Sequence, residues 1–226
     1  MNDNSQINQL LSVSAVITII GILFSGPVGV LIISALHPQP AWQGAKVFAD
    51  NYHRIQTLPF IFGFFMMFGF VLFISAIIQL ADTETKKTYG TMAVIFASAY
   101  VVTIGLNYVI QAIYIPEIIE ENEEFAGLLT MVNPSSFSWV LEMFGYGFLG
   151  AAGWLVAPIF EGNGIMKSIR YLLIANGIIS VVGVIIIAAD VEWVLSTSGL
   201  ISYVAWNLLI IITMILIFLE FKTKKI

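Results

Sequence analysis

The chain contains no cysteine, which excludes disulfide bonds, thiolate metal sites and a cysteine nucleophile. Charged residues are also scarce. Asp, Glu, Lys and Arg make up 10% of the 226 residues, whereas a soluble domain usually carries about 25%. Since 59% of the residues are hydrophobic, the lipid bilayer is the expected surrounding and partner of most of the protein surface.

Several catalytic and binding motifs are missing as well. There is no phosphate-binding glycine loop, no G-x-S-x-G nucleophile and no arginine-rich voltage-sensing helix. The two histidines, His37 and His53, form only a weak zinc pattern with Asp50, and polar anchors at the membrane surface are the favoured interpretation. We therefore predict no metal site and no cofactor. The formal net charge of -5, without an outward basic cluster, argues against a nucleic-acid partner.

Six apolar runs are long enough to cross a bilayer, which takes about 20 residues as a helix. They cover residues 9–36, 58–81, 90–115, 135–160, 168–189 and 197–220. The sequence thus predicts an all-α, polytopic membrane protein, a six-transmembrane-helix bundle with short loops that forms one domain over residues 1–226. The first run lacks the basic flank of a signal peptide, so we expect it to be retained as a span.

Local signals refine these spans. Pro27, inside the first run, is expected to kink it. Asn133 and Pro134 have the pattern of an N-cap followed by a first-turn proline and predict the start of the fourth helix. In the first connection, apolar residues at helical spacing predict a short amphipathic helix lying in the membrane interface; they are Ala41, Ala45, Phe48, Tyr52 and Ile55.

Basic residues are distributed unevenly between the two sides of the membrane. One side, with both termini, holds seven of the nine: Lys86, Lys87, Lys167, Arg170, Lys222, Lys224 and Lys225. The other side holds Lys46 and Arg54 together with eight acidic residues. Because basic residues accumulate on the cytoplasmic side, we expect a multi-pass protein of the cell membrane with cytoplasmic N- and C-termini.

Glu142 is the one acidic residue well inside an apolar run. With a rise of 1.5 Å per residue it lies roughly 12 Å below the outer end of the fourth span. An ionisable group at that depth is costly, which makes a functional site the first hypothesis. The alternative is a structural carboxyl group satisfied by one neighbouring side chain, and the sequence leaves both open.

Further polar side chains fall in the outer half of other spans or on the same helix face; they are Asn107, Gln111, Tyr146, Tyr203 and Asn207. If they converge with Glu142, they form a polar ligand-binding pocket whose apolar walls come from Trp139, Met143 and Trp206. For Asn107 and Gln111, hydrogen bonding between helices is the alternative and slightly favoured role. Small residues of the fourth run predict close helix packing there; they are Gly145, Gly147, Gly150 and Gly153.

A resemblance covers part of the chain. The stretch NPSSFSWVLEMFGYGFLGAAGWLVAPIF, residues 133–160, resembles a pattern found in small six-helix bacterial integral membrane proteins of unknown function. Residues 169–179 are similar to the same proteins in their Arg-then-Asn-Gly rhythm. The resemblance implies the six-span fold. It adds no chemistry, because that family has no settled activity.

Three functions are compatible with the sequence. The favoured one is the binding or transport of a small amphipathic or cationic ligand in the pocket around Glu142. The second is a membrane-embedded enzyme acting on a lipid or isoprenoid, with Glu142 as general acid or base. The third is a membrane scaffold or complex subunit, including a homo-oligomer, that pairs through the glycine-rich fourth helix. Whether the protein is an enzyme is left undetermined.

Overall fold

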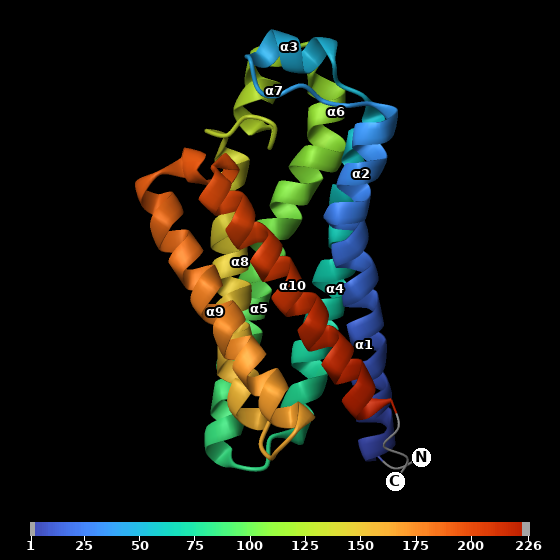
Figure 1. Cartoon of the computed structure of the whole chain (residues 1–226), viewed down its shortest axis with the longest axis vertical. Helices are drawn as coiled ribbons and strands as arrows, with labels where there is room; N and C mark the ends of the chain where they lie inside the picture. The colour runs from blue at the N-terminus through green and yellow to red at the C-terminus, as the bar shows by residue number, and fades with distance from the viewer. Residues whose placement is uncertain (1–2, 223–226) are drawn as a thin grey trace.

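The computed structural model describes residues 3–222 (Figure 1). In that part of the chain, six helices are long and apolar enough to cross a membrane: Ser5–Leu36, Arg54–Leu80, Glu84–Ile118, Phe137–Ile159, Ile165–Ala189 and Thr197–Phe221. They confirm the predicted all-α, six-helix membrane bundle. The third begins six residues earlier than predicted, because Thr83 caps it by accepting a hydrogen bond from the Lys86 N–H at 3.3 Å.

Each span is built from one or more helical elements. The first comprises α1 (Asp3–Ser25) and α2 (Pro27–Leu36), and the second comprises η1 (Arg54–Thr57), α4 (Leu58–Ile77) and η2 (Ile78–Leu80). The third comprises α5 (Glu84–Val109), the π turn η3 (Ile110–Tyr114) and α6 (Ile115–Ile118). The last three comprise α8 (Phe137–Val156) with η4 (Ala157–Ile159), α9 (Ile165–Ala189) and α10 (Thr197–Phe221). The connections contain α3 (Ala45–Asp50), α7 (Glu123–Leu129) and η5 (Val191–Leu195).

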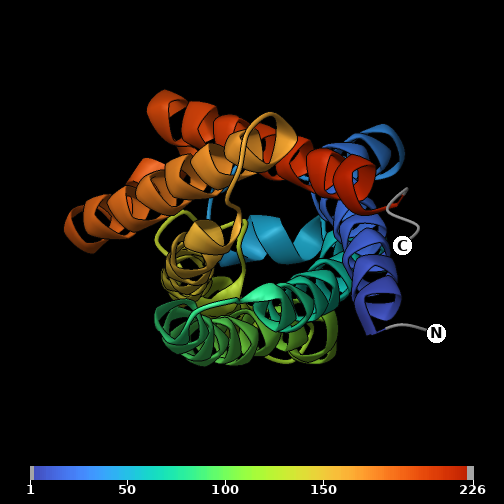
Figure 2. The same ribbon diagram turned by 90° about the horizontal axis from the view of Figure 1, so that it is seen from below.

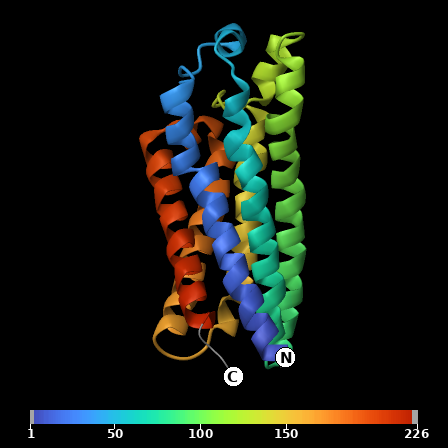
Figure 3. The same ribbon diagram turned by 90° about the vertical axis from the view of Figure 1, so that its right-hand side faces the viewer.

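The six spans form a ring in chain order. Helix α1 packs on α4, α4 on α5, α5 on α8, α8 on α9 and α9 on α10, and α10 returns to α1 (Figure 2). The start of α1, the end of α10 and the α4–α5 and α8–α9 connections lie at one end of the bundle, which we call the terminal end (Figures 1 and 3). Helices α3, α6 and α7 lie at the opposite end, which we call the α3 end (Figure 1).

The outer surface of this ring contacts lipid. Large apolar side chains are exposed on several helices, for example Ile95, Val102 and Ile185, which are 64%, 71% and 65% exposed. A soluble protein rarely exposes contiguous apolar surface on this scale. The chain is therefore an integral membrane protein.

The predicted kink at Pro27 is present. Helix α1 ends at Ser25 and α2 begins at Pro27, with Gly26 between them at φ −116° and ψ −115°. Proline at the first position of α2 has no N–H to donate and so interrupts the hydrogen-bond ladder. The two segments are visibly offset (Figure 3). As a result, α1 packs against α10, whereas α10 leans away from α2 toward the α3 end (Figure 1).

The terminal half of the ring is filled by apolar side chains. Leu11, Phe73 and Phe160 are each at most 1% exposed and belong to one continuous core. The α1–α4 contact is especially close, since a Cβ atom added to Gly21 would collide with the backbone of Met66. Small residues permit such close helix packing in membranes.

The predicted loop helix is present as α3, although it has only six residues. Its Phe48 side chain is 2% exposed and packs with Ile115, Ile119 and Ala126 from the third span and α7. The apolar face is therefore covered by protein instead of being left for the membrane interface. The sequence could not show this, because periodicity identifies an apolar face without identifying what covers it.

The predicted start of the fourth helix is wrong. Helix α8 begins at Phe137, with Ser136 as its N-cap. The Asn133 side chain instead closes a turn by accepting from the Ser135 N–H at 3.0 Å, and it donates to the Gly127 carbonyl at 2.8 Å. Asparagine commonly makes such turns with the residue two positions on, and here this use competes with helix capping.

The charge separation between the two ends is retained in the fold. At the terminal end, Lys86 Nζ lies 2.8 Å from Asp82 Oδ1 and 2.9 Å from Glu161 Oε2, which links the α4–α5 and α8–α9 connections. The hydrogen bond from Lys86 holds the pKa of Asp82 below its usual value. At the α3 end, Arg54 pairs with Glu117 at 3.2 Å. Lys224 and Lys225 lie outside the described residues.

Candidate functional site

A cavity of about 430 Å³ lies within the ring toward the α3 end. Helices α2, α4, α8, α9 and α10 and the outer part of the third span all contribute to its wall. Gln39, Phe48, Tyr52 and Gln56 of the first connection also line it, so this connection covers the α3 end of the cavity. The volume is in the range of small-molecule sites.

Glu142 is the only Asp, Glu, Lys, Arg or His among the cavity-lining residues of the described chain. It projects from α8 and is 8% exposed. Its Oε2 accepts a hydrogen bond from Asn107 Nδ2 at 2.7 Å, and its Oε1 accepts one from the Tyr108 hydroxyl at 3.3 Å. Both donors lie on α5, so the α5–α8 contact fixes the carboxyl group at one place on the wall.

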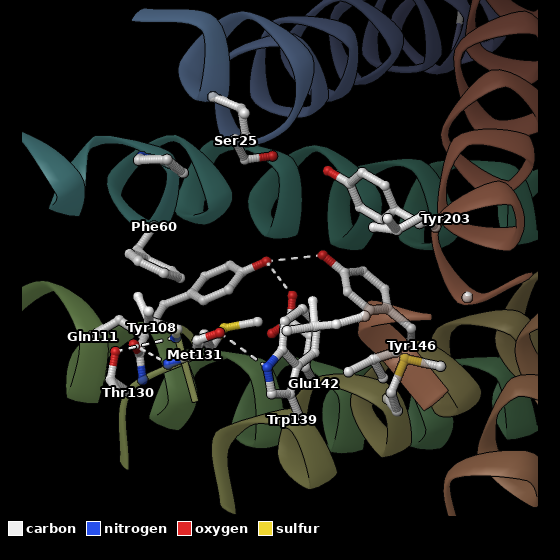
Figure 4. Close-up of a pocket in the computed structure, with 18 of the residues that line it drawn as sticks. Ser25, Phe60, Tyr108, Gln111, Thr130, Met131, Trp139, Glu142, Tyr146 and Tyr203 are labelled. Atoms are coloured by element: carbon white, nitrogen blue, oxygen red, sulfur yellow. Dashed lines mark hydrogen bonds between the residues drawn. The ribbon is translucent and has the colours of Figure 1, made fainter. Parts of the chain in front are cut away.

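The Tyr108 hydroxyl also lies 2.8 Å from the Tyr146 hydroxyl, which extends the network along α8 (Figure 4). The Tyr108 ring can occupy this position because its neighbour on α4 has no side chain. It lies against Gly63 of α4, where an added Cβ atom would collide with the ring. Gly63 therefore leaves the space that lets a side chain of α5 reach Glu142.

Asn107 lies behind Glu142 as seen from the cavity, and the two residues have different roles. Asn107 is fully buried and is not part of the cavity wall. It holds the carboxyl group from behind and also contacts Met131 Sδ at 3.5 Å. Its position suits the helix-joining role, while the ligand-contact role proposed for it stays a prediction.

Gln111 lines the cavity, but its amide group forms hydrogen bonds with the end of α7, the start of α8 and the chain between them. Its Nε2 donates to the Leu129 carbonyl at 2.8 Å and to Ser138 Oγ at 2.9 Å, and its Oε1 accepts from the Met131 N–H at 3.1 Å. Gln111 therefore positions this wall of the cavity. It lies in the π turn η3, which precedes Pro116, a residue without an N–H for the regular ladder.

Tyr203 and Asn207 line the wall of the cavity contributed by α10. Asn207 Nδ2 donates to the Tyr203 carbonyl at 2.8 Å. A Cβ atom added to Gly26 would lie 2.9 Å from the Tyr203 hydroxyl, so this side chain faces the α1–α2 break. Tyr203 and Ser25 lie on the side of the cavity away from Trp139 (Figure 4).

The cavity wall contributed by α2 and α10 includes exposed side chains. Val30, Leu200 and Tyr203 line it and are nevertheless 53%, 50% and 48% exposed. Val30 belongs to α2 and the other two to α10, which diverge beyond the Gly26 break (Figure 1). This part of the cavity wall therefore also forms part of the outer surface of the ring.

Aromatic rings form much of the cavity wall. Nine lining residues are aromatic: Phe48, Tyr52, Phe60, Tyr108, Trp139, Tyr146, Trp193, Tyr203 and Trp206. Trp139 Nε1 donates to the Met131 carbonyl at 3.0 Å, and Trp206 Nε1 donates to Ser180 Oγ at 3.0 Å. These bonds fix the two indole rings in position, because the single polar atom of each is occupied.

The first connection adds no charge to the cavity wall. Burial raises the pKa of Tyr52 to about 12, so its hydroxyl stays neutral at physiological pH. His37 and His53 stack with ring centroids 3.6 Å apart, and Asp50 pairs with Lys46 at 3.9 Å. Residues 3–222 contain no group of three or more His, Cys, Asp or Glu side chains placed to hold a metal ion.

The glycines of the fourth span pack against neighbouring helices of the same chain. Gly145 lies against Ile104 of α5, and Gly150 lies against Ser180 and Gly177 of α9. Gly147 and Gly153 are likewise buried in the bundle. The close packing predicted for this helix is therefore directed at its own neighbours, and it fixes the backbone that carries Glu142.

Sequence reasoning placed five of its six candidate residues on the cavity wall, Asn107 being the exception. It missed Tyr108, which is next to Asn107 in the same span and whose hydroxyl contacts both Glu142 and Tyr146. The sequence did contain a signal for it, because Tyr108 follows Asn107 and so falls at a depth similar to that of Glu142. The contributions of Gln39 and Tyr52 had no such signal, because they depend on how the first connection folds over the ring.

Comparisons with known protein families, with curated proteins and with solved structures find no match to this chain. The resemblance of residues 133–160 to small six-helix bacterial membrane proteins therefore stays a prediction.

Proposed function

We propose that this protein binds, or carries across the membrane, a small amphipathic molecule that presents a cationic or hydrogen-bond-donating group to Glu142. The observation that carries the proposal is the placement of one carboxyl group on the wall of an otherwise uncharged, largely aromatic cavity. A site of this kind orients a ligand through one polar contact and retains it through apolar contact.

The arrangement of Glu142 supports a binding role. An acidic side chain that served packing alone would need only its protein donors, Asn107 and Tyr108. A carboxylate can accept about four hydrogen bonds, so two donors leave capacity for a ligand. Glu142 also lines the cavity, where a ligand can reach its remaining acceptor positions.

The depth proposed for this cavity in the membrane rests on the orientation proposed for the chain. The predominance of basic residues at the terminal end supports cytoplasmic termini by the positive-inside rule. The cavity then lies in the outer half of the bilayer. The packed core around Phe73 and Phe160 separates it from the cytoplasmic side, so transport would require this half of the ring to open.

The experiment is native mass spectrometry of the protein extracted in mild detergent, comparing wild type with Glu142→Gln. We expect wild type to carry a bound small molecule and the variant to lose most of it, because glutamine keeps the size of the side chain and removes its negative charge. Glu120→Gln, at an exposed position away from the cavity, is the control and should retain the molecule. Equal occupancy in wild type and Glu142→Gln would contradict the proposal.

Two further measurements address the alternatives: incubation with a membrane lipid extract, and a search for a second protein chain in the native mass spectra. An enzyme acting on a lipid or isoprenoid would convert molecules in a membrane lipid extract into a new species, and this conversion should depend on Glu142. A scaffold would retain a second protein chain instead of a small molecule. Neither outcome is expected from the proposed binding function.

A further inference from the structure

The aromatic side chains around Glu142 identify the chemistry of the ligand more closely. Trp139 and Met143 lie on the same helix as Glu142 and line the cavity beside it. The Tyr146 and Trp206 ring centroids are 4.6 Å apart, and those of Phe60 and Tyr108 are 5.8 Å apart. The carboxyl group therefore shares this part of the cavity wall with the rings of Tyr108, Trp139 and Tyr146 (Figure 4).

The polar atoms of these rings are mostly occupied by protein partners. The Tyr108 and Tyr146 hydroxyls are 2.8 Å apart, and the Trp139 and Trp206 N–H groups donate to Met131 and Ser180. What the two indole rings offer a ligand is consequently their π surface, because the single polar atom of each is already bonded. A fixed π surface is prepared for contact without further loss of side-chain freedom.

Different cations make different demands on such a wall. A metal cation such as Ca²⁺ needs six or more oxygen ligands, and a primary ammonium carries three N–H donors that must be satisfied. Glu142 accepts hydrogen bonds from Asn107 and Tyr108, which leaves about two of its four acceptor positions for the three donors of a primary ammonium. An ammonium group substituted with carbon needs few or no acceptors, and it is attracted by a negative charge and by aromatic faces.

We propose that the cavity takes an organic ammonium group bearing methyl or other alkyl substituents, a tertiary or quaternary amine, with Glu142 as its counter-charge and Trp139, Tyr146 and Trp206 as its aromatic walls. This inference rests on the proposed binding function and narrows its ligand class. Two sources of the same chemistry are compatible with it, a choline-type lipid headgroup or a free amphipathic amine.

Three soluble probes of similar size test the inference by isothermal titration calorimetry on the purified protein in detergent. Benzyltrimethylammonium has the substituted cation, benzylamine has a primary ammonium at neutral pH, and benzyl alcohol is uncharged. We expect wild type to bind benzyltrimethylammonium roughly tenfold more tightly than either other probe, in keeping with a desolvated cation–π contact. Equal or tighter binding of benzylamine would overturn the inference.

Variants separate the charge from the ring faces. Glu142→Gln should weaken benzyltrimethylammonium binding about tenfold and leave benzyl alcohol unaffected, since only the cation loses its counter-charge. Trp139→Leu should weaken it several-fold, whereas Trp139→Phe, which keeps an aromatic face, should retain most of it. If Trp139→Leu folds and binds like wild type, the aromatic wall does not recognise the cation and the inference fails. Tyr146→Leu provides the same test at a second position.

The failure of this inference is distinguishable from that of the proposed function. If no probe binds but the native protein still carries a Glu142-dependent molecule, the ammonium class is wrong and the binding function stands. If no probe binds and the native protein is empty, both are wrong.

The source of the ammonium is tested in lipid nanodiscs. Weaker binding of benzyltrimethylammonium in nanodiscs with phosphatidylcholine than in phosphatidylglycerol alone would support competition by a lipid headgroup. Equal affinity in both would support a free amine as the ligand.

Discussion

The two halves of the bundle use the same six-helix ring for different purposes. In the terminal half, Leu11, Phe73 and Phe160 fill the centre and leave at most 1% of each side chain exposed. In the half near α3, the same spans enclose a cavity whose wall includes Glu142. The difference teaches that ring closure does not by itself decide whether the centre is filled. Side-chain size and the path of each helix decide it.

Two irregularities in the helices lie in the half near α3. The Gly26–Pro27 break separates α2 from the direction of α1, and the π turn before Pro116 changes the regular helical ladder of the third span. No corresponding break occurs in the terminal half within the described residues of α1, α5 and α10. Polar side chains then line the space near α3, held by hydrogen bonds between α5 and α8.

The largest expected effect is the loss of stability when a phenylalanine of the packed half is replaced by alanine, compared with the same replacement on the cavity wall. Phe73→Ala should lower the free energy of unfolding by about 3 kcal/mol, because it leaves a void in a packed core. Phe60→Ala, on the cavity wall, should cost about half as much or less, since one side of the ring already faces open space. Unfolding in mixed micelles of increasing denaturing-detergent fraction measures both. Equal losses would show that the two halves are packed alike.

A second pair of variants tests how closely the site depends on helix packing. Gly63→Ala places a methyl group against the Tyr108 ring, so it should cost about 1–3 kcal/mol of stability and weaken ligand binding. Gly105→Ala is the control, because its added Cβ atom would meet Met67 Cε at an ordinary 3.6 Å. Denaturing-detergent titration and the calorimetric assay should separate them. Similar behaviour of the two variants would argue against a positioning role for Gly63.

A smaller effect is expected when only the Tyr108 hydroxyl is removed. Tyr108→Phe keeps the ring against Gly63 but loses the bridge between Glu142 and Tyr146. Hydrogen bonds between membrane helices contribute about 0.6 kcal/mol on average, so stability should fall by about that amount while ligand binding weakens more visibly. Tyr171→Phe, at a 59% exposed position, should change neither quantity. Unchanged binding by Tyr108→Phe would limit the site to Glu142 itself.

The smallest effect concerns the ion pair at the terminal end. The lowered pKa of Asp82 means that, just below its unfolded value of about 3.9, the unfolded chain binds more protons than the folded protein. The stability contributed by Asp82 is therefore complete above that pH and is lost as the pH falls through the lower folded-state pKa. Unfolding measured between pH 3 and 6 should show a weaker pH dependence for Asp82→Asn than for Glu120→Gln. The change should be small, because the carboxyl group is solvent-exposed.

Sequence reasoning recovered the spans because apolar length is a direct requirement of the bilayer. It placed Glu142 at cavity depth from helical rise alone. It misplaced the start of α8, because the side chain of Asn133 can cap a helix or close a turn and the choice depends on its contact with Gly127. It also left the cover of the cavity open, since Phe48 and Tyr52 act through packing against other segments.

The sequence by itself determined that this is a six-span membrane protein with one acidic side chain deep in a span. The reason is that each span must form its backbone hydrogen bonds within one helix and present apolar side chains to lipid. Only the tertiary structure decided that Tyr108 joins Glu142 to Tyr146, that Asn107 stands behind the carboxyl group, and that the first connection covers the cavity. Those outcomes depend on helix rotation and on close contacts such as Tyr108 against Gly63. The hydropathy and residue spacing of one chain do not determine helix rotation or the contacts between helices.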